Sequence, residues 1–184
     1  MEKVKIDPNA FVYPMAVVLI GAMIKEKPNF MTVAWVSRVN YRPPMIAFSS
    51  GNTHYTNSGI KENKAFSVNI PGRSLIKETD HCGLVSGKNE DKSKLFEVFY
   101  GELKNAPMAK QCALSMECKL VDTVQLPSNT LFIGEIMAAY SESRYLTGGK
   151  PDIEKIRPFT LSMPDNKYWS IGENIGSAWK IGEA

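Results

Sequence analysis

The sequence predicts a mainly β protein, in which antiparallel strands form a closed or nearly closed small barrel with short helices inserted between them. Two observations predict this class. Five or more apolar segments have the length and the β-branched or alternating composition of strands, and turn residues separate several of them as in hairpins. Closure into a barrel is expected because it removes the exposed strand edges of such a sheet.

The first three predicted strands lie near the N-terminus. Residues 16–24 (AVVLIGAMI) form a continuous apolar run, as expected for a strand that is buried on both faces. The turn KEKPN leads to a second strand at residues 30–39, so the two strands form a hairpin. The motif YRPP then interrupts the sheet, because prolines lack the N–H donors of a strand ladder, and a third strand begins at residues 45–49.

Short helices and further strands are expected along the rest of the chain. Helical patterns occupy residues 55–63, 74–84 and 91–99, and further strands are expected at 65–70, 130–142, 159–163 and 167–171. The last two flank the turn PDN and form a closing hairpin.

The clearest strand alternation lies between residues 112 and 120. Apolar Cys112, Leu114, Met116, Cys118 and Leu120 share one face, and Ala113, Ser115, Glu117 and Lys119 share the other. This pattern predicts a half-buried strand that pairs with 130–142 across the loop PSN. Cys112 and Cys118 are therefore expected to be core residues that point to the same apolar face.

Composition narrows the functional class. The net charge of +3 comes from 22 basic and 19 acidic residues spread along the chain, so no nucleic-acid partner is expected. The longest apolar run is about half of a membrane span, and the N-terminus lacks the apolar segment of a signal peptide, so no membrane association is expected. An odd number of cysteines, three, favours a reduced, cytoplasmic protein. With no linker or repeat, residues 1–184 are predicted to form a single domain.

The stretch SSGNTHYTNSG, residues 49–59, is the strongest candidate for a binding site. It contains six hydroxyl side chains and a histidine but no acid, and it lies where a strand turns into a helix. Helix N-termini leave N–H groups unpaired and carry partial positive charge, so this turn suits a phosphate monoester. The alternative is that Thr53 only caps the helix and the remainder is a polar loop.

Other chemistries lack their motifs. The three cysteines and two histidines are not spaced for zinc or iron–sulfur ligation, and the G-x-S-x-G, P-loop and G-x-G-x-x-G motifs are absent from the sequence. Cys82 beside His81 is an alternative candidate as a reactive thiol, although adjacent helical residues point in different directions. Redox chemistry would therefore depend on a cofactor.

Several segments carry a resemblance to a known family. PMAVVLIGA, NFMTVAWVS, RPPMIAFSS, HYTNSGIKENKAFSVNI, GLVSGKNEDKSKLF and the C-terminal KPDIEKIRPFTLSMPDNKYWSIGENIGSAWKIG resemble the flavin reductase-like family with an FMN-binding split barrel, closest to its flavoredoxin branch. The match covers nearly the whole chain in the expected order. It implies an antiparallel, Greek-key-like split barrel and a homodimer that binds FMN non-covalently near the subunit interface.

The resemblance also implies cofactor-binding residues. Backbone groups of Thr32, Val33, Ala34 and Trp35 would meet the flavin's pyrimidine edge and ribityl chain, and Ser49, Ser50, His54, Tyr55 and Thr56 would hold the ribityl hydroxyls and phosphate. Asn69 would face the same pocket, and Lys88 or Lys92, in SGKNEDK, would approach the phosphate or the reducing substrate. Trp35 is otherwise a barrel-core residue, and each lysine is otherwise solvated.

The function implied is that of an FMN-dependent oxidoreductase, with NAD(P)H or a redox protein as the electron donor and a flavin, ferric complex or protein as the acceptor. One alternative is an FMN-binding electron carrier or storage module without nicotinamide-dependent turnover. A third hypothesis is a barrel that binds a phosphate ligand unrelated to flavin.

Overall fold

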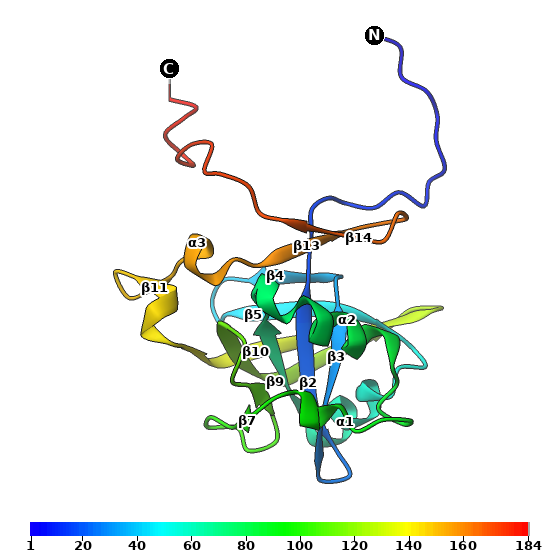
Figure 1. Cartoon of the computed structure of the whole chain (residues 1–184). Helices are drawn as coiled ribbons and strands as arrows, with labels where there is room; N and C mark the ends of the chain where they lie inside the picture. The colour runs from blue at the N-terminus through cyan, green and yellow to red at the C-terminus, as the bar shows by residue number, and fades with distance from the viewer. Residues whose placement is uncertain (184) are drawn as a thin grey trace.

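The chain folds around a seven-stranded antiparallel sheet, seen in a computed structural model that describes residues 1–183 (Figure 1). In spatial order its strands are β3 (Lys27–Val33), β2 (Val18–Ile24), β6 (Ala65–Ile70), β9 (Leu114–Gln125), β10 (Asn129–Ser141), β5 (Met45–Gly51) and β4 (Val36–Asn40). Smaller sheets and helices complete the fold: β1 (Met15–Ala16) with β13 (Phe159–Ser162) and β14 (Lys167–Ser170), β7 (Val98–Phe99) with β8 (Met108–Ala109), β11 (Leu146–Thr147) with β12 (Lys150–Pro151), α1 (Thr56–Asn63), α2 (Ile76–Leu84) and α3 (Ile153–Ile156). The predicted mainly β class, with short helices between strands, is confirmed.

The large sheet curls into a split barrel. β3 and β4 lie at opposite edges of the sheet, yet only Ala34 and Trp35 separate them in the sequence. The two edges must therefore come close together. Side chains confirm this approach, because Ser50 Oγ on β5 lies 3.8 Å from Met31 Sδ on β3.

Apolar side chains fill the barrel and a second, smaller core outside it. Within the barrel, the ring of Phe48 lies between Phe66, at 5.2 Å between ring centroids, and Phe132, at 5.1 Å. The smaller cluster contains Phe30 and Phe96, whose ring centroids are 5.1 Å apart. β2 contributes to both clusters, so it is buried on both faces as the sequence predicts.

Most predicted elements are confirmed. β2 and β3 form the expected hairpin, with Lys25 and Glu26 at its turn in the left-handed conformation (φ 47° and 64°). The sequence also correctly predicts β5, β6, α1 and β10. α2 lies in the helical segment expected at 74–84, and a short 3₁₀ turn at 73–75 begins one residue before that segment. β13 and β14 form the expected C-terminal hairpin, but they join β1 in the separate three-stranded sheet rather than the barrel.

Two predicted elements are wrong. Residues 30–39 do not form one strand, because the chain leaves β3 after Val33 and starts β4 at Val36 against β5. Residues 91–99 do not form a helix: a 3₁₀ turn at 92–95 is followed by β7, and Phe96 between them is buried in the smaller cluster. Tertiary packing of Phe96 overrides the local helical pattern.

The predicted half-burial of residues 112–120 is also wrong, because Ser115 and Glu117 are buried on the face expected to meet solvent. Cys112 and Cys118 are both buried, as predicted, but they belong to different clusters rather than one apolar face. Cys112 precedes β9, which begins at Leu114, so the period-two alternation does not extend to it.

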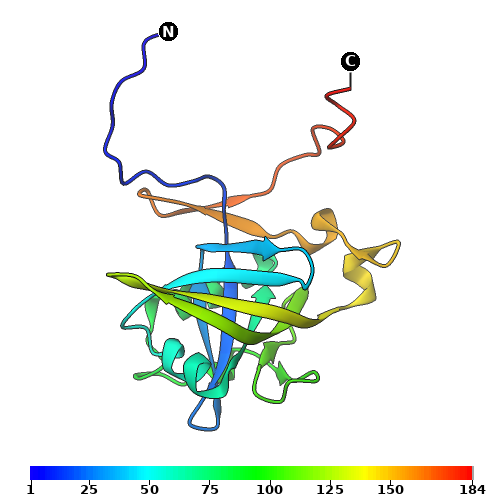
Figure 2. The same ribbon diagram turned by 180° about the vertical axis from the view of Figure 1, so that it is seen from behind.

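Both terminal segments extend away from the barrel. Residues 1–10 and 171–183 leave the molecule on the side of the β1–β13–β14 sheet, as two opposite views show (Figures 1 and 2). In the part of the chain described, no helix has the length and apolar character needed to span a membrane.

Candidate functional site

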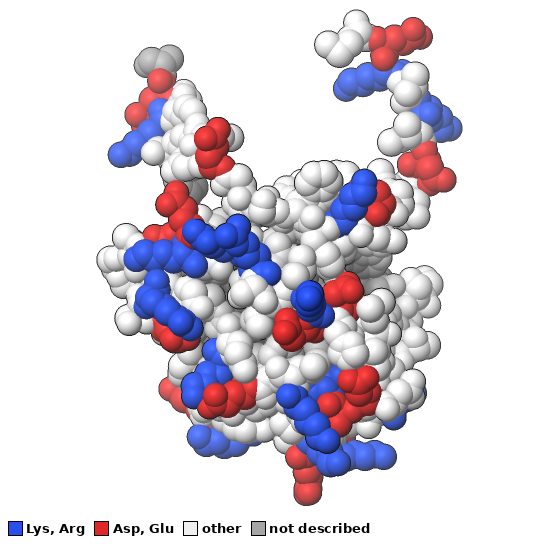
Figure 3. Space-filling model, in the orientation of Figure 1, with Lys and Arg blue, Asp and Glu red and all other residues white. Residues whose placement is uncertain are grey.

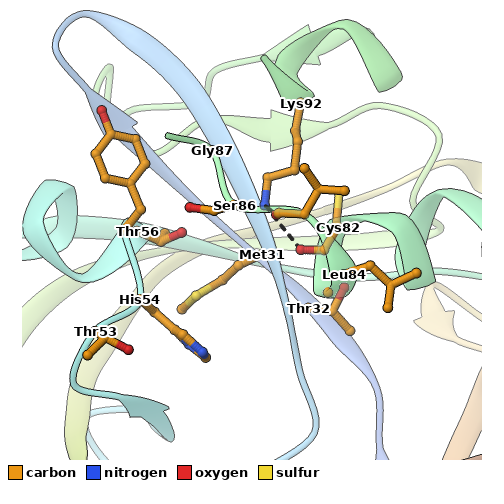
Figure 4. Close-up of a pocket in the computed structure, with 13 residues that line it drawn as sticks. Met31, Thr32, Thr53, His54, Thr56, Cys82, Leu84, Ser86, Gly87 and Lys92 are labelled. Atoms are coloured by element: carbon orange, nitrogen blue, oxygen red, sulfur yellow. Dashed lines mark hydrogen bonds between the residues drawn. The ribbon is translucent and has the colours of Figure 1, made fainter. Parts of the chain in front are cut away.

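The candidate site is a pocket of about 310 Å³ between the start of α1, the end of α2 and β3 (Figure 4). Its walls come from β3, the turn before α1, the end of α2 and the loop that follows α2. The lining residues are Met31, Thr32, Thr53, His54, Tyr55, Thr56, Cys82, Gly83, Leu84, Val85, Ser86, Gly87 and Lys92. A hydrogen bond from Thr32 Oγ1 to the carbonyl oxygen of Thr79 ties β3 to α2.

Hydrogen bonds beneath the pocket hold the turn before α1. Ser50 Oγ donates to Asn57 Oδ1 over 2.7 Å and lies 3.1 Å from His54 Nδ1. Asn57 Nδ2 in turn donates to the carbonyl oxygen of Gly51 over 2.8 Å. These contacts fix the path of the chain from β5 into the helix, so the backbone at Tyr55 is held in one orientation.

The start of α1 presents free donors to the pocket. Tyr55 is the N-cap residue and makes no side-chain capping bond, so the alternative that Thr53 caps the helix is wrong. Within residues 1–183, the backbone N–H groups of Tyr55 and Thr56 donate no hydrogen bond. Unpaired N–H groups at a helix N-terminus favour an anion.

The pocket's charge also suits an anion. No aspartate or glutamate is among its lining residues. Lys92 is only 2% exposed, and its Nζ donates to the carbonyl oxygens of Cys82 (3.1 Å) and Val85 (2.8 Å). Burial lowers the pKa of Lys92, and no carboxylate of residues 1–183 forms an ion pair with it. A buried cation without a counter-ion is costly, so an anionic ligand would stabilise it.

Cys82 lacks the environment of a reactive thiol. Burial raises the pKa of its thiol to about 11, which keeps the sulfur protonated at neutral pH. The neighbouring His81 does not activate it, because His81 Nε2 lies 2.8 Å from Glu90 Oε1. The geometry therefore does not support the thiol hypothesis.

The structure gathers five of the predicted site residues in the pocket: Thr32, His54, Tyr55, Thr56 and Lys92. Lys88 lines an adjoining cavity, which shares Tyr55, Gly87 and Lys92 with the pocket, and its Nζ lies 5.9 Å from the centroid of the Tyr55 ring.

The remaining predicted residues do not line the pocket. Val33 is buried in the barrel core, and Ser49 donates its backbone N–H to the carbonyl oxygen of Trp35 over 2.9 Å. Ser50 lies under the turn, as described above. Fully buried Asn69 uses its amide within the core, where it donates to Leu19 O and Ser67 Oγ and accepts from the Ala109 N–H.

Ala34 and Trp35 form the corner between β3 and β4. Trp35 is 48% exposed and lies 6.4 Å from Phe11 between ring centroids, so the alternative that it is a core residue is wrong. β3 is an edge strand of the large sheet, so part of its backbone has no strand partner. The predicted backbone contacts of residues 32–35 with a flavin stay a prediction.

Sequence reasoning missed the wall formed by the end of α2. Cys82, Gly83, Leu84, Val85, Ser86 and Gly87 all line the pocket, as do Met31 and Thr53. The segment SGKNEDK contains Ser86 and Gly87, but only its lysines were predicted to approach the phosphate or the reducing substrate. Thr53 lies inside the acid-free stretch 49–59, which the sequence predicts as the binding turn, but it is not among the residues predicted to contact the cofactor.

Charges outside the pocket are mixed on the face that Figure 3 shows. Basic and acidic residues are interspersed there, and the net charge of +3 is not gathered in one patch of that face.

Comparisons with known proteins show the family to which the chain belongs. Residues 10–150 match the family model described as a flavin reductase like domain. The crystal structure of a flavoredoxin from Methanosarcina acetivorans is 56% identical, with a TM-score of 0.98, and the match covers 100% of this chain and 98% of that one. The flavoredoxin of Desulfovibrio vulgaris (Miyazaki F) is 32% identical, with a TM-score of 0.90 and coverage of 98% and 100%.

A curated but uncharacterized protein from Archaeoglobus fulgidus is 34% identical over 145 residues, which are 78% of this chain and 81% of that protein. The family match confirms the resemblance seen in the sequence and supports FMN as the cofactor. Together, the matched residues and the split barrel establish that the chain belongs to the flavin reductase-like family.

Proposed function

We propose that this protein is an FMN-dependent oxidoreductase, which passes electrons from NAD(P)H or a redox protein to a flavin, ferric complex or protein acceptor. One observation carries the proposal: the pocket between α1 and α2 has free N–H donors, hydroxyl groups and a buried lysine, but no acid. This set of donors fits the phosphate of FMN.

Each part of the pocket has a role in the proposal. The N–H groups of Tyr55 and Thr56, with the hydroxyls of Thr56 and Ser86, would bind the phosphate, and Lys92 would balance its charge. The edge of β3 that has no strand partner would orient the flavin ring through backbone groups. Bound FMN would supply the capacity to take up and release electrons, which the side chains lack.

A visible spectrum and a reduction assay test this function. The purified protein should be yellow, and NADH or NADPH should bleach the bound flavin without oxygen; an added acceptor should then restore the colour. A yellow protein that neither nicotinamide bleaches would favour the carrier or storage module. A protein that takes up no FMN would contradict the proposal and favour a phosphate ligand unrelated to flavin.

A redox protein is a serious candidate for the donor. The two solved structures named above, at 56% and 32% identity, are both flavoredoxins. A donor protein would replace the nicotinamide in the same assay, so reduction by a ferredoxin or flavodoxin but by neither nicotinamide would identify this route.

The proposal includes a homodimer. The extended terminal segments carry exposed apolar side chains, including Ile175 and Trp179, which is 93% exposed. Exposed apolar surface of this kind favours association. Light scattering after size exclusion should give twice the monomer mass, and a monomer at micromolar concentration would contradict this part of the proposal.

A further inference from the structure

Asn29 is not among the site residues predicted from the sequence, but it forms a hydrogen bond with the hydroxyl group of Thr56. It lies on β3, is 6% exposed, and its Nδ2 donates to Thr56 Oγ1 over 2.7 Å. An amide nitrogen can only donate, so Thr56 Oγ1 accepts this bond. The proton of the Thr56 hydroxyl is therefore left free for another acceptor.

The free proton belongs to a hydroxyl that lines the candidate pocket (Figure 4). Thr56 is also one of the two residues whose backbone N–H groups have no partner at the start of α1. With Asn29 in place, Thr56 offers two donors to the pocket, one from the backbone and one from the side chain. Neither is used within residues 1–183.

Asn29 is itself held between two walls of the pocket. Its backbone pairs with Ala22 in the β2–β3 hairpin, and its Oδ1 faces the loop after α2, where a Cβ atom on Gly87 would lie only 2.1 Å away. The amide thus has its nitrogen toward α1 and its oxygen toward Gly87.

We propose that Asn29 is a positioning residue that makes the pocket selective for phosphate-bearing flavins. By donating to Thr56 Oγ1, it directs the Thr56 proton toward the ligand's phosphate and away from the protein. This inference rests on the proposed FMN function. Riboflavin, which has no phosphate, gains nothing from the arrangement.

Binding of FMN and riboflavin to the apo protein tests the proposal, with flavin fluorescence as the readout. Asn29→Ala should raise the dissociation constant for FMN about fivefold, the scale of one hydrogen bond, and leave that for riboflavin within about twofold. Asn29→Asp should weaken FMN further, because its carboxylate would accept the Thr56 proton and repel the phosphate.

A double-mutant cycle distinguishes an effect of Asn29 that acts through Thr56 from a general structural effect of the Asn29 substitution. If Asn29 acts through Thr56, Asn29→Ala should have almost no effect on FMN binding in a Thr56→Ala background. Asn63→Ala is the matched control, because Asn63 Nδ2 ties the other end of α1 to the carbonyl oxygen of Met23 at 2.9 Å. Asn63→Ala should either change the dissociation constants for FMN and riboflavin by the same factor or leave both unchanged.

Three results would overturn the inference: equal losses of FMN and riboflavin binding in Asn29→Ala, full additivity with Thr56→Ala, or FMN affinity in Asn29→Asp equal to that of the wild type. Each leaves the proposed function standing, provided that the wild-type protein binds FMN. Failure of the wild type to bind FMN would contradict the proposed function itself, so the two failures are distinguishable.

Discussion

The ammonium group of Lys92 lies 2.8 Å from the carbonyl oxygen of Val85, so a buried cation holds the loop that forms one wall of the candidate pocket. The same ammonium donates to the carbonyl oxygen of Cys82, at the end of α2. Carbonyl groups solvate the charge without neutralising it. One side chain therefore shapes the pocket and makes it attractive to a phosphate.

Lys92→Met should weaken FMN binding at least tenfold, because a hydrogen bond to a charged group contributes about 1.5–3 kcal/mol. The dependence of FMN affinity on salt concentration should also decrease in this variant. Titration of the apo protein with FMN at two ionic strengths measures both effects. Lys94→Met changes an exposed lysine nearby and serves as the control. Unchanged FMN affinity in Lys92→Met would remove this lysine from the site.

Cys82 should be inert in the native protein. Burial raises the pKa of its thiol from 9.0 to about 11, so iodoacetamide should label Cys82 very slowly at pH 8 and faster only as the pH approaches 11. Between pH 9 and 11 the unfolded chain releases this proton and the native state keeps it. The contribution of Cys82 to the free energy of unfolding should therefore fall as pH rises through this window. Mass spectrometry of labelled peptides measures the rate, and rapid labelling at pH 8 would contradict the expectation.

The substitution Cys82→Ser should leave the rate of flavin reduction unchanged, because the buried thiol carries no reactive thiolate. Stopped-flow bleaching by a nicotinamide or protein donor measures this rate. A large loss of rate, with FMN still bound, would restore the thiol as a participant.

The sequence predicts the barrel strands better than it predicts the site. Strands such as residues 65–70 are correct because their apolar pattern and flanking turns are local properties. The break at Ala34 and Trp35 was missed because the apolar run continues through the corner, and only pairing with a different strand reveals it. Local patterns cannot show such a change of partner.

In the candidate site, too, the residues that are contiguous in the sequence were predicted, and those brought in by long-range packing were not. His54, Tyr55 and Thr56 are contiguous, so composition alone predicted that wall of the pocket. Residues 82–87 reach the pocket only because α2 packs on β3. The local sequence does not indicate this long-range contact. Asn69 has a polar side chain at the end of a predicted strand, but its partners are distant carbonyl and N–H groups of the core.

Gly87→Ala should distort the pocket without unfolding the barrel. A Cβ atom at this position would lie 2.1 Å from Asn29 Oδ1 and 3.1 Å from Tyr55 Cδ1, so the loop or the amide must move. FMN affinity should fall by roughly tenfold or more, because a small displacement breaks the aligned hydrogen bonds to the ligand. Fluorescence titration measures the affinity, and Gly149→Ala, with open space around its Cβ, is the control for loop glycines although its positive φ adds some strain. Wild-type affinity in Gly87→Ala would show that this loop does not contact the ligand.

Glu117 is a buried carboxylate that does not line the pocket. We expect its substitution to change the stability of the protein and not its FMN affinity. It is fully buried on β9 and accepts hydrogen bonds from the backbone N–H groups of Glu102 (3.0 Å) and Leu103 (2.8 Å) and from the Tyr140 hydroxyl (2.8 Å). Donation to Glu117 raises the pKa of Tyr140, which keeps that hydroxyl a donor. The carboxylate thus ties the loop at residues 101–105 to the sheet.

Glu117→Gln should lower the free energy of unfolding by about 2–4 kcal/mol, because the amide NH₂ would meet an N–H donor in place of an acceptor. Tyr140→Phe removes one of the three bonds and should cost less, about 1–2 kcal/mol. Urea denaturation of the apo protein measures both. Glu102→Gln changes an exposed side chain beside the same loop and should stay within about 0.5 kcal/mol of the wild type. FMN affinity should not change in any of the three variants, because none of these residues lines the pocket. A Glu117→Gln variant as stable as the wild type would mean that the buried carboxylate does not hold the loop.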